Sequence, residues 1–387
     1  MNDAHRALFI GLCSRILVVS VFVLCSGLFA VSSLQPATHI ANPLPLVNLF
    51  NRYDSGFYIS IAMNGYPTGS PKADWAFFPL YPSAIKAVSL PLMPFFGDNA
   101  LGLQNSIELA GFLLSNVCFF LSIFFFYKLT NKIFRLQKIA LVATAFYSFW
   151  GGAIFLSAIY SEALFMALTL GAFYYLEKDK LPTAVLLGFL ASFTRSDGFL
   201  ICIPFLIYAL QSIKDKPKTI KLVTCSVLVA SPFLIFQLIG YVVAGGVFPV
   251  TLISHNLNFG IYPLLTTQLM SLSSKQLLAF YVFGLLLIFM PAAYFVSRLF
   301  SGSAKNYLIQ EAKQLKYWAF YASMIFVIIF QSYLFSTIRY AVPMLPIYWV
   351  SAIIYNKNRL IGIILFAAMT GMLIIGSYMF ETGGSFF

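Results

Sequence analysis

Long apolar segments recur along almost the whole of this sequence, and the short connections between them carry most of its lysines and arginines. A helix needs about 20 predominantly apolar residues to cross the hydrocarbon core of a bilayer. Such segments predict about eleven transmembrane helices, over residues 8–33, 106–127, 139–157, 160–176, 183–194, 198–213, 220–243, 276–297, 317–336, 341–355 and 360–379. We therefore expect an all-α polytopic membrane protein, in which residues 1–387 form a single transmembrane domain.

The composition excludes a soluble globular domain. Of the 387 residues, 60% are hydrophobic and 9% are charged, whereas about a quarter are charged in soluble domains. The net charge of +12 is not gathered in a compact basic domain, so no nucleic-acid partner is expected. The five cysteines show no paired spacing, which argues against disulfides and thiolate metal sites. No cofactor is expected, although a divalent cation held by Asp54 and Asp74 remains open.

The positive charges instead indicate how the chain lies in a cell (plasma or inner) membrane. With the N-terminus in the cytoplasm, 18 of the 24 lysines and arginines fall on the cytoplasmic side and 6 outside, as the positive-inside rule requires. An odd number of passes then places the C-terminus outside. The run from Ile16 to Ala30 also resembles a signal peptide, but a retained first helix is favoured because the apolar stretch continues to Leu34.

Several of the expected helices are short, and polar residues gather where they end. Around residues 157–162, 194–198 and 339–346 the sequence predicts helices that stop at a cavity or re-enter. The acidic residues expected outside are Asp54, Asp74, Asp98, Glu108, Glu162, Asp197 and Glu381. Ionisable groups close to the hydrocarbon are costly, so this set indicates a polar site on the outer side.

The first outer loop, residues 35–105, is expected to contain interfacial helices. Apolar residues recur at helical spacing from Pro45 to Ile61, which predicts one amphipathic helix along the membrane surface. Asn51, Asp54 and Ser55 would share its polar side, with Tyr58 one turn beyond Asp54. The turn residues 64–67 would end this helix, and a second short helix is predicted over residues 80–93.

Asp54 is the best candidate for a catalytic base. A hydroxyl that attacks a sugar carbon needs a carboxylate to take its proton and a cation near the leaving phosphate. The alternatives for Asp54 are an ion pair with Arg52 or a helix cap. Arg195 and Arg339 are outer-side arginines at helix ends, and their planar donors suit phosphate oxygens. Either could instead reach lipid headgroups, and Arg195 could pair with Asp197.

Other polar residues are weaker candidates for substrate binding. Glu162 either lines the same cavity or caps the helix that begins there. Asp74 precedes Trp75 and could assist Asp54 or bind sugar hydroxyls. His255 is isolated from the other histidines, so no set with metal-ligand spacing is present in the sequence.

Six motifs taken together resemble the PIG-V-like mannosyltransferases, whose members include the enzyme that adds the second mannose of the GPI anchor. The motifs occur in family order at Arg52-Tyr53-Asp54-Ser55-Gly56-Phe57-Tyr58, Ile61-Ala62, Gly65-Tyr66, Ala76-Phe77-Phe78-Pro79-Leu80-Tyr81-Pro82, Tyr160-Ser161-Glu162 and Thr194-Arg195-Ser196-Asp197-Gly198. A weaker echo follows at Arg339-Tyr340 and from Pro343 to Pro346. Two positions depart from the pattern, because Tyr53 stands where the family usually has tryptophan and Asp197 where eukaryotic members tend to have asparagine.

The resemblance implies a GT-C glycosyltransferase fold with an essential aspartate in the first outer loop, which Asp54 matches. It also implies an inverting transfer of mannose from dolichyl- or polyprenyl-phosphate mannose to a lipid-linked glycan, glycolipid or protein acceptor outside the cytoplasm. Membrane lipids are the other expected partners, and a prokaryotic member is favoured. The candidate donor-phosphate and substrate residues are Arg52, Tyr58, Asp74, Tyr160, Glu162, Arg195, Asp197, His255 and Arg339.

Two other functions remain open at this stage. A transporter or flippase of lipid-linked sugars would use the same charges as a substrate path, but it predicts symmetry-related halves and midplane charges. No internal repeat is evident in the sequence. An inactive scaffold subunit of a glycosyltransferase complex is the other alternative.

Overall fold

The computed structural model describes residues 3–28, 43–69, 73–246, 248, 275–300, 314–329 and 336–382, and no strand occurs among them. The longer helices are α1 (Asp3–Leu28), α5 (Ala100–Phe134), α6 (Gln137–Ser148), α7 (Glu162–Leu176), α8 (Leu181–Ser192), α10 (Lys216–Val243), α14 (Lys275–Phe300), α16 (Leu315–Ile329), α18 (Leu345–Lys357) and α19 (Arg359–Thr382). The shorter helices are α2 (Pro45–Leu49), α3 (Ser55–Asn64), α4 (Leu80–Ser89), α9 (Cys202–Gln211) and α17 (Thr337–Tyr340). Four 3₁₀ helices join them: η1 (Ala73–Ala76), η2 (Leu90–Phe95), η3 (Gly151–Leu156) and η4 (Ser196–Ile201).

Every segment expected to cross the membrane contains one of these helices. Among the described residues, α1, α5, α10, α14 and α19 are long and apolar enough to span a bilayer. The helices α7, α8 and α16, and the continuous stretch formed by η4 and α9, are apolar but shorter. The all-helical fold is thus confirmed, while the number of about eleven passes remains a prediction.

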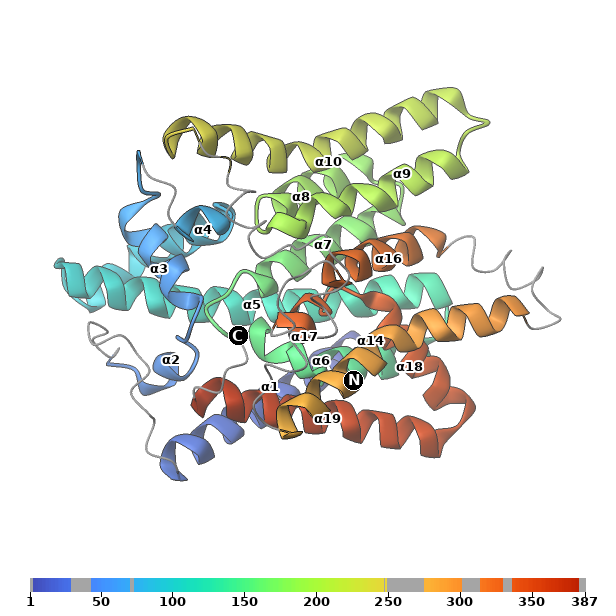
Figure 1. Cartoon of the computed structure of the whole chain (residues 1–387), viewed down its shortest axis with the longest axis horizontal. Helices are drawn as coiled ribbons and strands as arrows, with labels where there is room; N and C mark the ends of the chain where they lie inside the picture. The colour runs from blue at the N-terminus through green and yellow to red at the C-terminus, as the bar shows by residue number, and fades with distance from the viewer. Residues whose placement is uncertain are drawn as a thin grey trace.

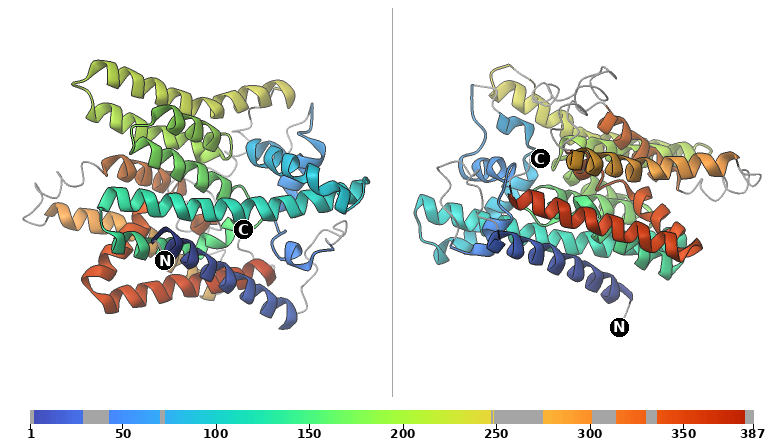
Figure 2. Two further views of the ribbon diagram at one scale, coloured as in Figure 1. Left: turned by 180° about the vertical axis from the view of Figure 1, so that it is seen from behind. Right: turned by 60° about the horizontal axis from the view of Figure 1, so that its bottom comes forward.

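The helices lie roughly along the long axis of the molecule (Figure 1). The long helix α5 contacts α1, α4, α6 and α7 and runs through the middle of the bundle. Helices α2, α3 and α4 gather at one end, beside the start of α5, and the view from behind shows the same arrangement (Figure 2). The turns from α9 to α10 and from α18 to α19 lie at the opposite end (Figure 1).

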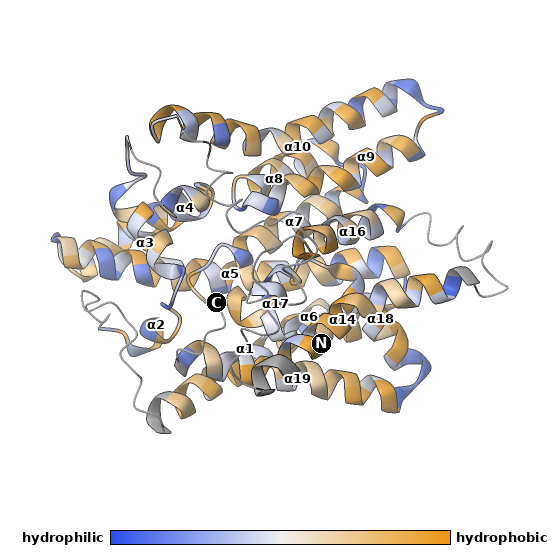
Figure 3. Cartoon of the chain, in the orientation of Figure 1, coloured by the Kyte–Doolittle hydropathy of each residue, from blue (hydrophilic) through white to orange (hydrophobic). Residues whose placement is uncertain are grey.

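The outward faces of the peripheral helices are apolar, as Figure 3 shows for α10 and α19. Val227 and Leu234 on α10, and Leu360 and Ile364 on α19, are each at least 60% exposed. Soluble proteins rarely expose apolar faces of this extent. The chain is therefore a multi-pass membrane protein whose outer surface faces lipid.

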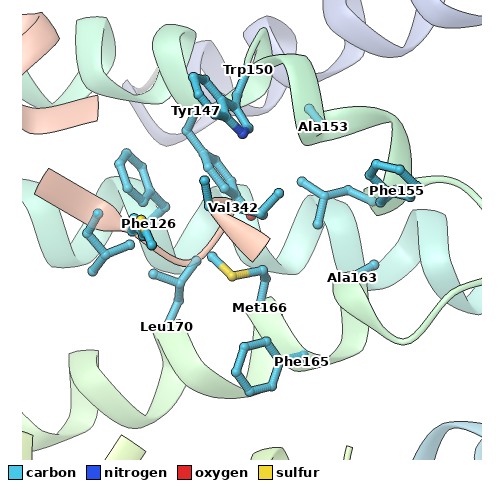
Figure 4. Close-up of a cluster of buried hydrophobic side chains, with 14 of the residues drawn as sticks. Phe126, Tyr147, Trp150, Ala153, Phe155, Ala163, Phe165, Met166, Leu170 and Val342 are labelled. Carbon is cyan, nitrogen blue, oxygen red and sulfur yellow. The ribbon is translucent and has the colours of Figure 1, made fainter. Parts of the chain in front are cut away.

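A core of large side chains joins α5, α6 and α7 to the segment just after α17 (Figure 4). The ring of Phe126 stacks on Tyr147, with 4.8 Å between centroids. The indole N–H of Trp150 donates a hydrogen bond of 3.0 Å to the carbonyl of Ile338. This bond fixes α17, which carries Arg339, against the break that follows α6.

The break between α6 and α7 leaves carbonyl groups that no helix satisfies, and Arg15 supplies donors to them. Its guanidinium donates to the carbonyl of Ala153 and to the Ser157 hydroxyl, both at 2.8 Å. It also lies 4.2 Å from the ring centroid of Phe119. Arg15 is one of the 18 lysines and arginines counted on the cytoplasmic side, and the structure buries it inside the bundle. Irregular backbone in a membrane protein needs internal hydrogen-bond partners, and Arg15 supplies them here.

The prediction of one amphipathic helix from Pro45 to Ile61 was wrong. The chain forms α2 and α3 with an irregular segment between them, in which Tyr53 has a left-handed φ of 50°. The Phe50 carbonyl accepts a hydrogen bond from the Ile159 amide at 3.1 Å, and the Phe50 ring packs on Phe22. These tertiary contacts override the local helical pattern, and Asn51 is buried instead of sharing a polar face with Asp54.

The second predicted interfacial helix is present as α4, which continues as the 3₁₀ helix η2 from Leu90 to Phe95. Pro91 and Pro94 fall within η2. Proline has no amide hydrogen and its ring clashes with the preceding turn, which accounts for the change from α to 3₁₀ geometry.

We expect Gly152→Ala to destabilise the protein. A Cβ at this position would lie well inside van der Waals distance of the Ile338 carbonyl oxygen, which is backbone and cannot move aside. Overpacking of this kind costs about 1–3 kcal/mol, measurable as a lower melting temperature in detergent. Gly371→Ala is the matched control, since its Cβ would meet no heavy atom within 4 Å. Equal melting temperatures for both variants would contradict the close contact.

Candidate active site

A cavity of about 240 Å³ lies where α3 and the end of η1 meet the starts of α7, η4 and α17. It is lined by Asp54, Tyr58, Ala76, Phe77, Phe78, Ser161, Thr194, Arg195, Ser196, Ser336, Arg339 and Tyr340. Each of the three predicted helix interruptions contributes lining residues. The prediction that these helices stop at a cavity is confirmed.

The irregular backbone at each interruption aims its arginine at the cavity. Arg195 follows α8 in an extended conformation (φ −149°, ψ 154°) and immediately precedes η4. Arg339 belongs to α17, which spans only 4 residues. Pro343 follows within a few residues and restricts the residue before it to non-helical conformations. In an uninterrupted helix these arginines would not both point into the cavity. The breaks in the helices therefore bring the two guanidinium groups together.

A chain of alternating charges runs from the cavity into the bundle. Asp54 Oδ2 accepts a hydrogen bond from Arg339 Nη1, and Arg339 Nε donates to Glu162 Oε1. The same Glu162 oxygen also accepts from Arg195 Nη1. Arg195 Nε then donates to Asp197 Oδ1 at 2.9 Å. Three carboxylates and two guanidinium groups are thus connected, with a formal sum of one negative charge.

Exposure changes sharply along this chain of charges. The side chains of Glu162 and Asp197 are each 3% exposed, whereas that of Asp54 is 30% exposed. Among the described residues, Asp54 Oδ1 accepts no hydrogen bond. Asp54 is therefore the end of the chain that is open to a ligand, and the other carboxylates hold the arginines.

Aromatic rings flank both guanidinium groups. Arg339 lies 4.5 Å from the ring centroid of Tyr160, and Arg195 lies 5.2 Å from that of Tyr340. Cations at these distances are attracted by the negative faces of the rings. The rings also exclude water from one side of each arginine, which strengthens its ion pairs.

The backbone around Asp54 is fixed by Tyr160. The Asp54 amide donates to the Tyr160 hydroxyl at 3.2 Å, and that hydroxyl donates to the Arg52 carbonyl at 3.2 Å. Asp54 is the residue before α3, but its side chain makes no capping hydrogen bond. The two structural alternatives for Asp54, a helix cap and an ion pair with Arg52, are therefore both absent.

Tyr58 contributes a neutral hydroxyl to the cavity. Its hydroxyl and that of Ser161 share a hydrogen bond of 2.7 Å. Burial raises the pKa of the Tyr58 phenol well above its usual range, so the group stays protonated at physiological pH. Tyr58 can donate or accept a hydrogen bond to a ligand, but it cannot serve as a base.

The remaining candidates stand apart from the cavity or outside the described residues. Arg52 pairs with Glu381 at 3.0 Å, and Asp74 lies on η1 without lining the cavity. His255 lies outside the described residues. Across the described part of the chain, no group of three or more histidine, cysteine, aspartate or glutamate side chains has the geometry to hold a metal ion.

Sequence reasoning missed several residues of the site. Three hydroxyl groups on the cavity wall were not predicted, those of Ser161, Thr194 and Ser196. Each of these residues is adjacent in sequence to Glu162 or Arg195. Glu381 was counted among the outer acidic residues but was not connected to Arg52. The only signal for it was an isolated carboxylate at the end of an apolar segment.

A comparison with known families matches residues 25–245, that is 221 of the 387 residues, to the family described as Mannosyltransferase (PIG-V). GPI mannosyltransferase 2 of Schizosaccharomyces pombe is 29% identical over 198 residues, which cover 49% of this chain and 37% of that protein. GPI alpha-1,6-mannosyltransferase 2 of Mus musculus is 31% identical over 210 residues, which cover 51% of this chain and 41% of that protein. The chain thus matches less than half the length of these curated relatives.

A solved structure shares the fold at low sequence identity. The apo form of the oligosaccharyltransferase from Archaeoglobus fulgidus superposes with a TM-score of 0.50 at 11% identity. The superposition covers 98% of this chain and 56% of that one. At this identity the likeness concerns the fold alone.

We expect Glu162→Gln to destabilise the protein by about 3–5 kcal/mol, because it leaves two buried guanidinium groups without their shared carboxylate. Asp54→Asn acts on the exposed end of the same chain of charges, and its cost should stay below about 1 kcal/mol. Melting temperatures of the two variants in detergent would test the difference. A Glu162→Gln protein as stable as Asp54→Asn would show that Glu162 does not hold the arginines together.

Proposed function

Because the chain belongs to the PIG-V mannosyltransferase family and has the helical GT-C fold, we propose that it transfers mannose from a polyprenyl-phosphate donor to an acceptor hydroxyl. The acceptor is a lipid-linked glycan, a glycolipid or a protein on the side of the membrane where α2–α4 lie. One observation carries the proposal: the carboxylate of Asp54 and the guanidinium groups of Arg195 and Arg339 line the same cavity.

In the proposed reaction the acceptor hydroxyl oxygen attacks C1 of mannose while the bond from C1 to the phosphate oxygen breaks. The hydroxyl proton passes to the Asp54 carboxylate, which acts as general base. Polyprenyl phosphate leaves with the electron pair of the broken bond and gains one negative charge. Arg195 and Arg339 stabilise that charge as it develops.

The geometry supports a single displacement with inversion at C1. A retaining mechanism needs a second free carboxylate as nucleophile, about 5 Å from the first. Glu162 and Asp197 are buried and bound to arginines, so they are not available to attack a sugar. Asp54 is the carboxylate among the cavity-lining residues, and one base suffices for direct displacement.

The contacts already made by the two guanidinium groups suggest where the donor phosphate binds. Nε and Nη1 of both Arg195 and Arg339 donate to carboxylate oxygens, so a phosphodiester would bind by taking over one of these contacts. Asp54 is the exposed partner of Arg339. We propose that a phosphate oxygen replaces Asp54 at Arg339 Nη1, which frees Asp54 Oδ2 for the acceptor hydroxyl.

The hydroxyl groups on the cavity wall complete the proposal. Tyr58, Ser161, Thr194 and Ser196 line the cavity beside the charged residues, and neutral hydroxyls suit the hydroxyl groups of a hexose as donors and acceptors. We propose that they orient the mannose so that C1 faces the acceptor oxygen.

The proposed orientation places the N-terminus in the cytoplasm and the C-terminus and cavity outside. The turns between α9 and α10 and between α18 and α19, which are bounded by lysines and arginines, lie at the end opposite α2–α4 (Figures 1 and 3). Positive residues favour the cytoplasmic side of a membrane. For a prokaryotic member this membrane is the cell membrane.

We expect Asp54→Asn to lower the rate of mannose transfer by about 10²–10⁴-fold, the usual contribution of a general base. The assay combines purified protein with labelled polyprenyl-phosphate mannose and a crude membrane acceptor. Asp98→Asn is the matched control, because it makes the same change at an exposed residue of the same loop. Undiminished transfer by Asp54→Asn would rule out the assigned base, and movement of the donor across vesicles without a new bond would identify a transporter.

We also expect farnesyl phosphate to raise the melting temperature of the wild-type protein. A ligand at about 100 times its Kd stabilises the folded state by about 2.7 kcal/mol. Arg339→Lys keeps the charge but cannot reach Glu162 and a phosphate together, so the shift should largely disappear in this variant. Farnesol, which lacks the phosphate, is the control ligand. An equal shift with farnesol would mean that the chain recognises the hydrocarbon and not the phosphate.

A further inference from the structure

The loop that carries Asp54 is bound to the far end of the chain. Arg52 Nη2 donates a hydrogen bond of 3.0 Å to Glu381 Oε1, across a separation of 329 residues. Glu381 lies in the last turn of α19, and its side chain is 1% exposed. Neither residue lines the cavity, and Glu381 lies outside residues 25–245, which carry the family match.

The pair is a poor source of stability. Within the described residues, Glu381 Oε2 and Arg52 Nε are buried and make no hydrogen bond. A buried ion pair with unsatisfied atoms regains little of the free energy lost when its charges leave water. The main effect of the pair is therefore to hold the backbone at Arg52 in place, and it contributes little to the free energy of folding.

Aromatic contacts from the same turn of α19 reinforce this attachment. The ring of Phe380, which is fully buried, lies 5.6 Å from the ring of Tyr53 and 6.2 Å from that of Tyr160. It also stacks on Phe22, with 5.9 Å between centroids. Phe380 thus packs against both Tyr53, which precedes Asp54 in the loop, and Tyr160, whose hydroxyl binds the Asp54 amide.

The ion pair of Arg52 with Glu381 is connected to Asp54 through two backbone hydrogen bonds to the Tyr160 hydroxyl. Arg52 accepts the hydrogen bond from the Tyr160 hydroxyl with its carbonyl, and the Asp54 amide donates to that same hydroxyl. Between them, Tyr53 is held at φ 50°, a left-handed conformation that is unfavourable for a residue other than glycine. Such a conformation persists only where the surroundings enforce it.

We propose that Glu381 is a positioning residue for the base, which acts through Arg52 to hold the Asp54 loop in its strained conformation. Without its charge, Arg52 loses its anchor and the segment from Phe50 to Tyr58 relaxes. The carboxylate of Asp54 then spends less time facing the cavity, while Arg195 and Arg339 stay in place. The catalytic part of this inference rests on the proposed function, whereas the effect on the loop does not.

Hydrogen–deuterium exchange of the full chain in lipid nanodiscs tests the effect on the loop. In Glu381→Gln, amides between residues 50 and 58 should exchange roughly ten- to hundredfold faster, the range expected on losing one charge-assisted hydrogen bond. Arg52→Gln should give the same acceleration. The double variant should exchange no faster than either single variant, because both remove one interaction.

Glu177→Gln is the matched control. Glu177 pairs with the buried Lys316 at 2.6 Å, and it follows the 15 residues of α7, a helix length of about 22 Å. This variant should lose stability without faster exchange at residues 50–58. Unchanged exchange in Glu381→Gln, or equal acceleration in Glu177→Gln, would overturn the proposal.

Transfer kinetics separate this inference from the proposed function. With labelled polyprenyl-phosphate mannose, Glu381→Gln should lower kcat about tenfold or more while the KM for the donor changes less than about twofold, because the arginines are untouched. A higher KM with unchanged kcat would refute the positioning role. If the wild-type protein transfers no mannose, the proposed function fails, and the exchange experiment still decides whether Glu381 holds the loop.

Discussion

Two guanidinium groups share one buried carboxylate oxygen at the centre of this structure, because Arg195 and Arg339 both donate to Glu162 Oε1. A buried guanidinium group is costly unless it is paired and hydrogen-bonded, and Glu162 supplies such a partner to both arginines at once. Glu162 begins α7, where the helix dipole also favours a negative charge. The start of one helix thus brings together the interruptions of two others, and the cavity forms where the three meet.

Interrupted helices carry a cost in a membrane protein, since their carbonyl and amide groups find no water in the hydrocarbon. The structure meets that cost with side chains. Arg15 satisfies the carbonyl of Ala153 behind the site, the indole of Trp150 satisfies that of Ile338, and Ser192 donates to the carbonyl of Gly198 at 2.9 Å. Side chains thus satisfy irregular backbone both at the cavity wall and in the segment behind it.

The sequence was sufficient to predict the helical class, the positions of the interruptions and most charged residues of the cavity. These follow from apolar segment length and from the rarity of ionisable residues near hydrocarbon. The pairing of the charges could not be predicted, because Arg339 contacts Asp54 across 285 residues and no local pattern encodes such a contact. The helix expected through Phe50 failed for the same reason, since Ile159 draws that backbone away from helical geometry. Arg52, which neighbours Asp54 in sequence, binds the opposite end of the chain.

The separation between Asp54 and Arg339 also bears on how the protein is made. During synthesis at about 5–20 residues per second, the 285 residues between them take roughly 15–60 s to emerge. For much of that time Glu162 and Arg195 have already entered the membrane while Arg339 is still unmade. Until Arg339 is made, the nascent chain therefore carries an incomplete set of the charges that are buried together in the folded protein.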